Sequence, residues 1–487
     1  MTISFSEHEE VILRKVCSNC TSEEYLAELI REEGEVEACY YCEDESNCVT
    51  VDELANKIEA AFNDHFSLTS TEPNAFQSMM LKDKESDYDW YREGQETVWA
   101  IADAARVSED IARDVQSVLE YRHEDWDSAL AGIECEFSSD AHYEEIMPEN
   151  LQWHSQWDEF ERLIKTEARF FSRTAASYLA DLFDEIDQMR THDGRSLIAS
   201  AGPDTEITSL FRGRVFQSEE PLLEAMRRPD LGLAAPPATA AASGRMNARG
   251  ISVFYGATTP EIALAEVRPP VGSRAAIARF DMIRPLRLLD LSALAEIQES
   301  GSIFDQSYAY RLGRMMFLRT LSSKMARPVM PDDQELEYLP TQAIADYLST
   351  ESKVPLDGIL FPSVQVGGEG VNAVLFHKAS RCEKLDLPEG TSIRANLYSM
   401  YEGGPEADYF VSEEVPPEEE MNDEGSSKRR SMRPPVDWRD NFDADPRIDA
   451  LKVDTDSVRV HEINAVQIET FSHGVRRTRY EKRVPPF

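Results

Sequence analysis

The sequence predicts an α+β protein in which a mostly helical first half precedes a sheet that is built late in the chain. Apolar residues keep a helical period over Thr97–Glu120 and Trp157–Met189, and charged residues occupy the other faces. After Pro203 the pattern changes to short, often alternating apolar runs bounded by Gly, Pro or Asn, which is typical of strands. Helical patterns between these runs indicate a mixed architecture.

Changes in composition and hydrophobic pattern divide the 487 residues into five parts. The length alone suggests roughly three folded domains. The two most local signals are capping-box pairs, Thr21 with Glu24 and Thr50 with Glu53, which predict helix starts. We predict a cysteine-pair zinc-binding segment, a helical domain, an α+β domain, a disordered acidic and Pro-rich linker, and a C-terminal β-hairpin that returns to the sheet. Their ranges are 1–62, 63–198, 199–395, 396–445 and 446–487.

The formal net charge of −41 is the most unusual bulk property. It argues against nucleic acid and anionic membranes as partners, because both require a basic surface. The N-terminus lacks the features of a secretory signal, and no apolar run approaches the roughly 18 residues of a membrane span. We therefore expect a cytoplasmic protein.

Four of the seven cysteines form two tight pairs. Each C-x2-C pair supplies two thiolates at one turn, and an 18-residue spacer separates the pairs. Two such turns provide the tetrahedron of sulfur that Zn²⁺ takes in a closed, structural site. Inert buried thiols and a redox-active C-x-x-C are the alternatives, and Cys48 is a spare that could replace one ligand. The predicted ligands are Cys17, Cys20, Cys39 and Cys42.

The strand-like region carries an unusual density of polar groups. An arginine begins one strand, a Gly-Arg-Met-Asn motif precedes the next, and a tyrosine lies on that strand. A glutamate follows within an apolar helical run, and a serine and an asparagine flank a Gly-rich loop further on. These candidates are Arg212, Arg245, Asn247, Tyr255, Glu266, Ser363 and Asn372.

Four motifs resemble, in order, those of the RES family over Leu210–Phe376: FRGRVF, GRMNARGISVFYGATTPEIALAEVRP, TQAIADYL and LDGILFPSVQVGGEGVNAVLF. The N-terminal cysteine pairs and the helices behind them are similar to the HEPN/RES-associated N-terminal domain. The resemblance implies a fold distantly similar to ADP-ribosylating toxins and an activity that degrades NAD by phosphorolysis or hydrolysis. It also implies NAD as substrate, phosphate as a possible co-substrate, and a toxin restrained by a protein antitoxin or regulator.

The resemblance carries over residue by residue. One departure is Phe211, which stands where the family has an aromatic residue that is often Tyr. The matches are Arg212 to the first family arginine, Arg245 to the arginine of the GR-x-N motif that also holds Asn247, Tyr255 to the tyrosine of the next strand, Glu266 to the family glutamate, Ser363 to the family serine and Asn372 to the asparagine that follows it.

The chemistry of these side chains agrees with such roles. Arginines can bind the pyrophosphate of NAD through paired N–H donors, which suits Arg212 and Arg245. Breaking the N-glycosidic bond builds positive charge on the ribose, and the Glu266 carboxylate can stabilise that charge. Tyr255 offers a face to the cationic nicotinamide ring. Ser363 and Asn372 can donate to an amide, a ribose hydroxyl or phosphate.

Two other functions remain open from the sequence. A mono-ADP-ribosyltransferase would use the same pocket and pass ADP-ribose to a macromolecule. An interaction protein would have an inactive pocket and would bind a partner through its acidic N-terminal half. A Ser-His-Asp hydrolase and a Rossmann dehydrogenase lack support, because no histidine lies beside Glu266 or Ser363 and no G-x-G-x-x-G opens a helix.

Overall fold

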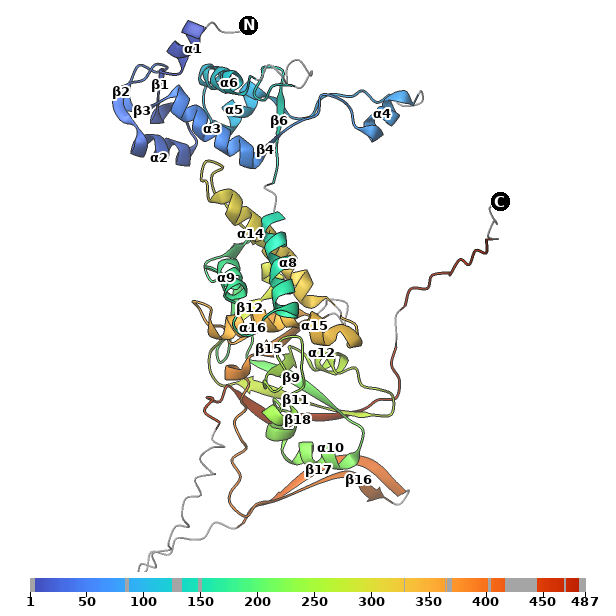
Figure 1. The fold of residues 1–487 in the computed structure, drawn as a ribbon. Helices are drawn as coiled ribbons and strands as arrows, with labels where there is room; N and C mark the ends of the chain where they lie inside the picture. The colour runs from blue at the N-terminus through green and yellow to red at the C-terminus, as the bar shows by residue number, and fades with distance from the viewer. Residues whose placement is uncertain are drawn as a thin grey trace, which may run out of the picture. The chain divides into compact units, whose positions relative to one another are not determined.

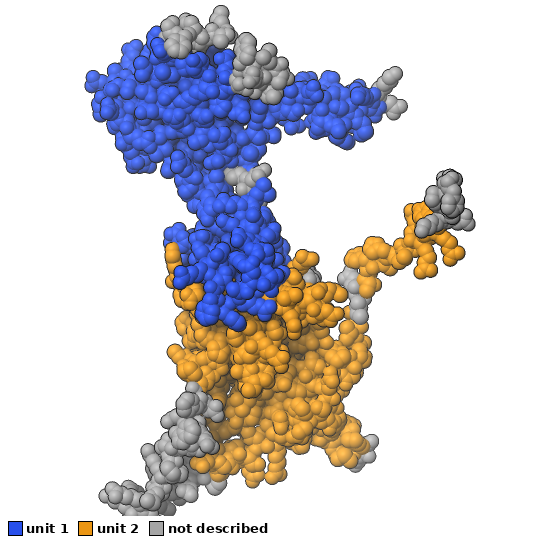
Figure 2. Space-filling model, viewed as in Figure 1, with its two compact units in different colours: residues 1–197, 293–325 blue, residues 198–292, 326–487 orange. Residues whose placement is uncertain are grey.

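The computed structural model describes residues 5–83, 87–124, 134–147, 151–327, 329–363, 365, 370–401, 404–416, 445–467 and 470–480. The chain divides into two units, coloured in Figure 2. Unit 1 comprises residues 1–197 and 293–325, and unit 2 comprises residues 198–292 and 326–487. No helix among the described residues has both the length and the apolar character needed to cross a membrane.

Unit 1 begins with a three-stranded antiparallel sheet that carries the cysteine pairs, in the order β1-β3-β2. A second small sheet, β4-β6-β5, and the β7-β13 pair follow among helices. The elements are α1 (Phe5–Val11), β1 (Lys15–Cys17), η1 (Ser18–Cys20), α2 (Glu24–Glu33), β2 (Glu35–Ala38), β3 (Glu45–Thr50), α3 (Val51–His65), β4 (Phe66–Leu68), α4 (Ala75–Lys82), β5 (Gln95–Glu96), α5 (Thr97–Ala105), α6 (Glu109–His123), β6 (His142–Glu145), α8 (Leu151–Thr166), α9 (Arg173–Leu182), β7 (Arg190–Thr191), β13 (Ile297–Gln298) and α14 (Tyr308–Ala326).

Of the two predicted helix starts, the one at Thr50 is confirmed and the one at Thr21 is wrong. Thr50 and Glu53 form the capping box of α3, because each side chain bonds to the backbone of the other residue. Helix α2 instead starts with Glu23 as its cap. The Thr21 hydroxyl lies outside the helix, where it donates to the carbonyl of Ala105 and accepts from the backbone N–H of Glu23.

The two long helical runs are each broken in the structure. The first becomes α5 and α6, separated at Arg106, whose φ of 49° is left-handed. The second becomes α8 and α9, and Ser172 caps α9. Apolar residues keep a helical period before and after each break, because each of the four helices buries one apolar side. The period alone therefore does not show where a turn separates two helices.

The predicted boundary at residue 62 does not separate two cores. Residues of α2 and α3 share one buried cluster with α5 and α6, which joins the cysteine segment to the helices. Residues 293–325, expected in the α+β domain, also belong to unit 1. Phe317 of α14 packs there against Trp153 and Trp157 of α8, which explains the assignment.

Unit 2 is built on an eight-stranded mixed sheet in the order β18-β11-β9-β10-β15-β14-β12-β8 (Figure 1). All neighbours are antiparallel except β12 and β14, which are parallel. The α+β class predicted from the sequence is confirmed. The elements are β8 (Ile198–Ala201), β9 (Ser209–Phe216), α10 (Glu219–Arg227), α11 (Pro229–Gly232), η2 (Ala238–Ala240), β10 (Phe254–Ala257), α12 (Pro260–Glu266), β11 (Arg274–Met282), β12 (Leu286–Asp290), α13 (Leu291–Leu294), η3 (Pro331–Asp333), α15 (Gln334–Glu337), α16 (Leu339–Thr350), β14 (Gly358–Pro362), β15 (Val371–Leu375), η4 (His377–Ala379), β16 (Ser392–Tyr401), β17 (Gly404–Glu414) and β18 (Leu451–Glu462).

The C-terminal part differs from the expected linker and hairpin. The first residues of the expected linker form β16 and β17, a hairpin beside α10 (Figure 1). Ala395 and Leu397 anchor it because their side chains are buried in the unit 2 core. The expected disorder of 417–444 lies outside the described residues. One strand, β18, returns to the sheet edge beside β11, and no partner strand follows it among residues 465–467 and 470–480.

Candidate functional site

A cavity of about 220 Å³ opens in unit 2 beside α12 and the middle of the large sheet. Four of its lining residues stand directly opposite one another on adjacent strands, in the order Phe211, Ala257, Asn372, Phe361. Directly opposed residues point to the same face of a sheet. The strands therefore provide an aromatic residue at each end of this row and a small residue and an amide between them.

Glu266 reaches this cavity from the last turn of α12. Thr259 caps the start of the helix, and Pro260 occupies its first position. Gly213 of β9 lets the helix approach closely, because a Cβ there would lie 3.0 Å from the carbonyl oxygen of Ala263. The local sequence therefore sets both the start of the helix and its distance from the sheet.

Two side chains hold a single oxygen of the Glu266 carboxylate. Ser363 Oγ and Asn372 Nδ2 both donate to Oε1, each at 2.6 Å. No donor among the described residues reaches the other carboxylate oxygen, and Glu266 lines the cavity. The arrangement fixes the direction of the carboxylate and leaves Oε2 for a ligand.

Asn372 and Ser363 are themselves deeply buried, at 3% and 0% exposure. The Nδ2 group of Asn372 donates to Glu266. The Oδ1 atom of Asn372 is buried without a hydrogen-bond partner in the part of the chain that the structure describes. A buried acceptor without a partner costs about 1–3 kcal/mol. Asn372 therefore acts as a donor that fixes Glu266, while its own Oδ1 is closed off from the cavity.

Arg212 lies where the sheet opens between β9 and β10, which pair only at Phe211 and Ala257. Its Nη1 donates to the backbone oxygen of Tyr255 at 2.8 Å, and the guanidinium lies 5.1 Å from the ring centroid of Phe254. No carboxylate among the described residues pairs with it. Burial lowers the pKa of Arg212 to about 10, so a cation without a counter-charge lines the cavity at neutral pH.

Tyr255 connects the cavity to the loop that contains the Gly-Arg-Met-Asn motif. Its hydroxyl accepts from the backbone N–H of Met246 and donates to Oδ1 of Asn247, both at 3.0 Å. Asn247 Nδ2 in turn donates to three backbone carbonyls of the same loop. Burial raises the pKa of Tyr255 to about 12, so the hydroxyl keeps its proton. These bonds give Tyr255 and Asn247 a task in positioning the loop.

The structure places the predicted residues in two groups: those that line the cavity and those that lie behind or beside it. Arg212, Tyr255, Glu266 and Asn372 line the cavity, and Ser363 lies behind Glu266. Asn247 and Arg245 belong to the adjoining loop and are not among the lining residues; the Arg245 guanidinium lies 5.3 Å from the ring centroid of Tyr338. Phe361 also lines the cavity but was not predicted from the sequence. It lies two residues before Ser363, so the alternation of side chains along a strand could have placed Phe361 and Ser363 on the same face of the sheet.

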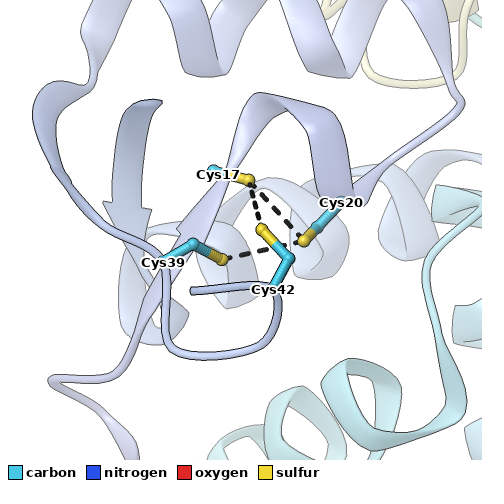
Figure 3. Close-up of side chains that lie close together, drawn as sticks. All are labelled: Cys17, Cys20, Cys39 and Cys42. Atoms are coloured by element: carbon cyan, nitrogen blue, oxygen red, sulfur yellow. Dashed lines mark hydrogen bonds between the residues drawn. The ribbon is translucent and has the colours of Figure 1, made fainter. Parts of the chain in front are cut away.

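The four predicted cysteines converge in unit 1 (Figure 3), with all ligand atoms within 4.8 Å of one another. The closest sulfur pairs are 3.5–3.7 Å apart, near the roughly 3.8 Å edge of a tetrahedron with metal–sulfur bonds of about 2.3 Å. Cys48 is outside the cluster because its thiol donates to backbone carbonyls of Ser46 and Glu37.

The electrostatics of the thiols also fit a metal ion. Burial, with a further contribution from Cys42, raises the pKa of Cys17 to about 11. Burial opposes ionisation of Cys39 too, yet backbone N–H groups of Cys42 and Tyr41 lower its pKa to about 7. A cation bound among the sulfurs would balance adjoining thiolates, which otherwise repel one another. Because their four ligand atoms lie so close together, the cysteines could hold a metal ion such as zinc.

The loop between Cys39 and Cys42 is joined to the helical part of unit 1 by polar contacts. The Tyr41 hydroxyl donates to Asp114 of α6, and Arg14 donates to the same carboxylate at 2.7 Å. The Arg14 guanidinium lies 4.5 Å from the ring centroid of Tyr40. Both tyrosines between Cys39 and Cys42 are therefore engaged with the rest of the unit.

Comparison with known families bears on the region around the cavity. Residues 221–395 match the family model of the RES domain. The match confirms the resemblance for this region. It includes Tyr255, Glu266, Ser363 and Asn372 but begins after Arg212. The RES domain is linked to NAD-related, toxin-like proteins and is consistent with an enzyme that acts on NAD.

The remaining comparisons add no further similarity. No family match names the N-terminal part that carries the cysteines, so its similarity to the HEPN/RES-associated domain stays a prediction. No curated protein and no solved structure matches the chain.

Proposed function

We propose that the RES region degrades NAD by cleaving the bond between nicotinamide and ribose, with water or phosphate as acceptor. One observation carries the proposal: a carboxylate with one oxygen fixed by Ser363 and Asn372 shares a cavity with a half-buried arginine that has no acidic partner among the described residues. The first group suits a developing cation, and the second suits a phosphate.

The proposed chemistry follows from these positions. The C1′–N bond breaks, its electron pair leaves with nicotinamide, and positive charge develops on the ribose. Oε2 of Glu266 stabilises that charge, or holds the ribose 2′-hydroxyl, while Ser363 and Asn372 keep the carboxylate in place. Ser363 acts as a positioning residue in this scheme, because its hydroxyl donates to Glu266 and it is fully buried.

The rings in the cavity wall supply a place for the flat nicotinamide. Phe211 and Phe361 line the cavity beside Tyr255, whose hydroxyl is engaged with the neighbouring loop. Aromatic faces attract cationic rings. We therefore propose that nicotinamide lies against these side chains, with Tyr255 contributing its ring and not its hydroxyl.

We further propose that Cys17, Cys20, Cys39 and Cys42 hold one structural zinc ion. Four protein ligands leave no open position for water, so the ion would stabilise the fold of the first residues and take no part in the reaction. A reducing, cytoplasmic setting suits these free thiols. A toxin role and a protein antitoxin or regulator are proposed from the family resemblance alone.

Incubation of the purified protein with NAD, with and without phosphate, tests the proposal. Hydrolysis gives free ADP-ribose, phosphorolysis gives ADP-ribose 1″-phosphate, and a mono-ADP-ribosyltransferase would leave a labelled macromolecule. We expect nicotinamide release with a small-molecule product. The absence of nicotinamide release from a folded, zinc-loaded protein would refute the proposed function.

A further inference from the structure

The size of the cavity limits how much of a substrate it can enclose. As bounded by the described residues it measures about 220 Å³, whereas pockets that enclose drug-sized ligands measure about 300–1,000 Å³. NAD consists of two nucleotides joined through their phosphates. The cavity has room for no more than the half that carries the scissile bond.

The polar groups of the cavity match the chemistry of that half. Arg212 uses one donor on a backbone carbonyl, and a guanidinium carries five N–H donors, so most of them remain for an anion. Glu266 Oε2 is an acceptor without a protein donor among the described residues. A ligand with one phosphate, a hydroxyl donor and a cationic ring matches Arg212, Glu266 and the aromatic wall of the cavity.

We infer that the cavity recognises a single nucleotide, so that nicotinamide mononucleotide is a substrate alongside NAD. The inference rests on the proposed NAD-cleaving function. Arg212 binds the 5′-phosphate, which in NAD is one phosphate of the pyrophosphate. Glu266 Oε2 accepts from a ribose hydroxyl, and the adenosine half of NAD remains outside the cavity.

The reaction balances with either acceptor. The C1′–N bond of the cationic nucleotide breaks, and its electron pair makes nicotinamide neutral. A new C1′–O bond forms from water or from inorganic phosphate, and the proton of the attacking group passes to solvent. The products are nicotinamide with ribose 5-phosphate or with ribose 1,5-bisphosphate.

Nicotinamide release from three substrates tests the inference on the wild-type protein. We expect kcat/KM for nicotinamide mononucleotide within about tenfold of that for NAD. Nicotinamide riboside lacks the phosphate and leaves the Arg212 cation without an anionic partner, so its kcat/KM should be about a hundredfold lower or more. Arg212→Gln should shrink this difference between mononucleotide and riboside to less than about fivefold.

Two further variants separate the role of Arg212 from a general loss of charge or of fold. Arg214→Gln removes an exposed cation from the same strand and should keep the wild-type preference. Arg212→Lys retains a cation and should keep part of it. If Arg212→Gln fails to fold, the wild-type comparison and Arg212→Lys still decide the question.

The outcomes distinguish this inference from the proposed function. Cleavage of NAD without cleavage of the mononucleotide overturns the inference and leaves the proposed function standing. Equal cleavage of mononucleotide and riboside overturns the phosphate role of Arg212. Failure to cleave any of the three substrates refutes the proposed function itself.

Discussion

Replacing Glu266 by Gln removes the charge of the carboxylate while its shape and contacts persist. The side-chain oxygen of Gln can accept the same two bonds, 2.6 Å from Ser363 Oγ and 2.6 Å from Asn372 Nδ2 in the native protein, and its amide then takes the place of Oε2. Each bond changes from charge-assisted to neutral, which lowers the free energy of unfolding by at most about 2 kcal/mol in total. The fold should therefore survive.

The effect on the reaction should be much larger than the effect on stability. Removing one well-placed electrostatic contact to a transition state costs about 2.7–4 kcal/mol, which corresponds to a rate loss of about 10²–10³. We expect this loss in kcat, because the positive charge on the ribose develops during the reaction. Chromatographic measurement of nicotinamide release at saturating NAD gives the value.

Glu261 provides a matched control for this experiment. It lies on the same helix, α12, and its side chain is exposed. Glu261→Gln should keep kcat within about twofold of the native value. A Glu266→Gln protein that folds and turns over NAD within about fivefold of the native rate would contradict the role of that carboxylate.

Three other perturbations have defined outcomes. Elemental analysis should find about one zinc per chain, lost in the Cys17→Ser, Cys39→Ser double variant and kept in Cys48→Ser, whose thiol is outside the cluster; native protein purified without chelator and free of zinc would refute the metal site. Tyr255→Phe leaves the bonding groups of the neighbouring loop unpaired, so urea denaturation should show a loss of about 1–3 kcal/mol, and an unchanged midpoint would contradict its positioning role. Burial lowers the pKa of Arg212 to about 10. The preference for nicotinamide mononucleotide over its riboside should therefore be steady from about pH 7 to 9 and should fall as the pH rises through about 10, because the cation is lost. A preference that persists well above that pH would argue against Arg212 as the anion site.

Local patterns predicted several elements because their causes are local. The strand-like runs predicted after Pro203 correspond to β9, β10, β11, β12, β14 and β15, since alternation and flanking breakers reflect burial on one face. These runs are SLFRGRVF, GISVFYGA, SRAAIARFDM, RPLRLLDL, DGILFPSV and NAVLFH. The helical patterns predicted between them, EIALAEVR, Tyr308–Ser322 and Thr341–Leu348, correspond to α12, α14 and α16. Two C-x2-C turns likewise specify which sulfurs can meet, because each turn fixes its own pair.

Errors arose where contacts between distant residues outweigh a local pattern. The charged residues after 396 favoured a linker, yet Ala395 and Leu397 are buried in the unit 2 core and a hairpin forms. Residues 293–325 join unit 1 through packing against helix α8, which lies more than a hundred residues earlier.

The α+β class, the four convergent cysteines and the residue types gathered around Glu266 follow from the amino-acid sequence alone. How those residues divide their hydrogen bonds depends on the three-dimensional fold. Ser363 and Asn372 donate to the same oxygen of Glu266 because β14, β15 and α12 meet there. Arg212 lies in the opening between β9 and β10, where no acidic side chain among the described residues pairs with it. A donor or acceptor in a sequence has no fixed partner, since the partner depends on strand register and helix placement, which are set by contacts across the whole unit.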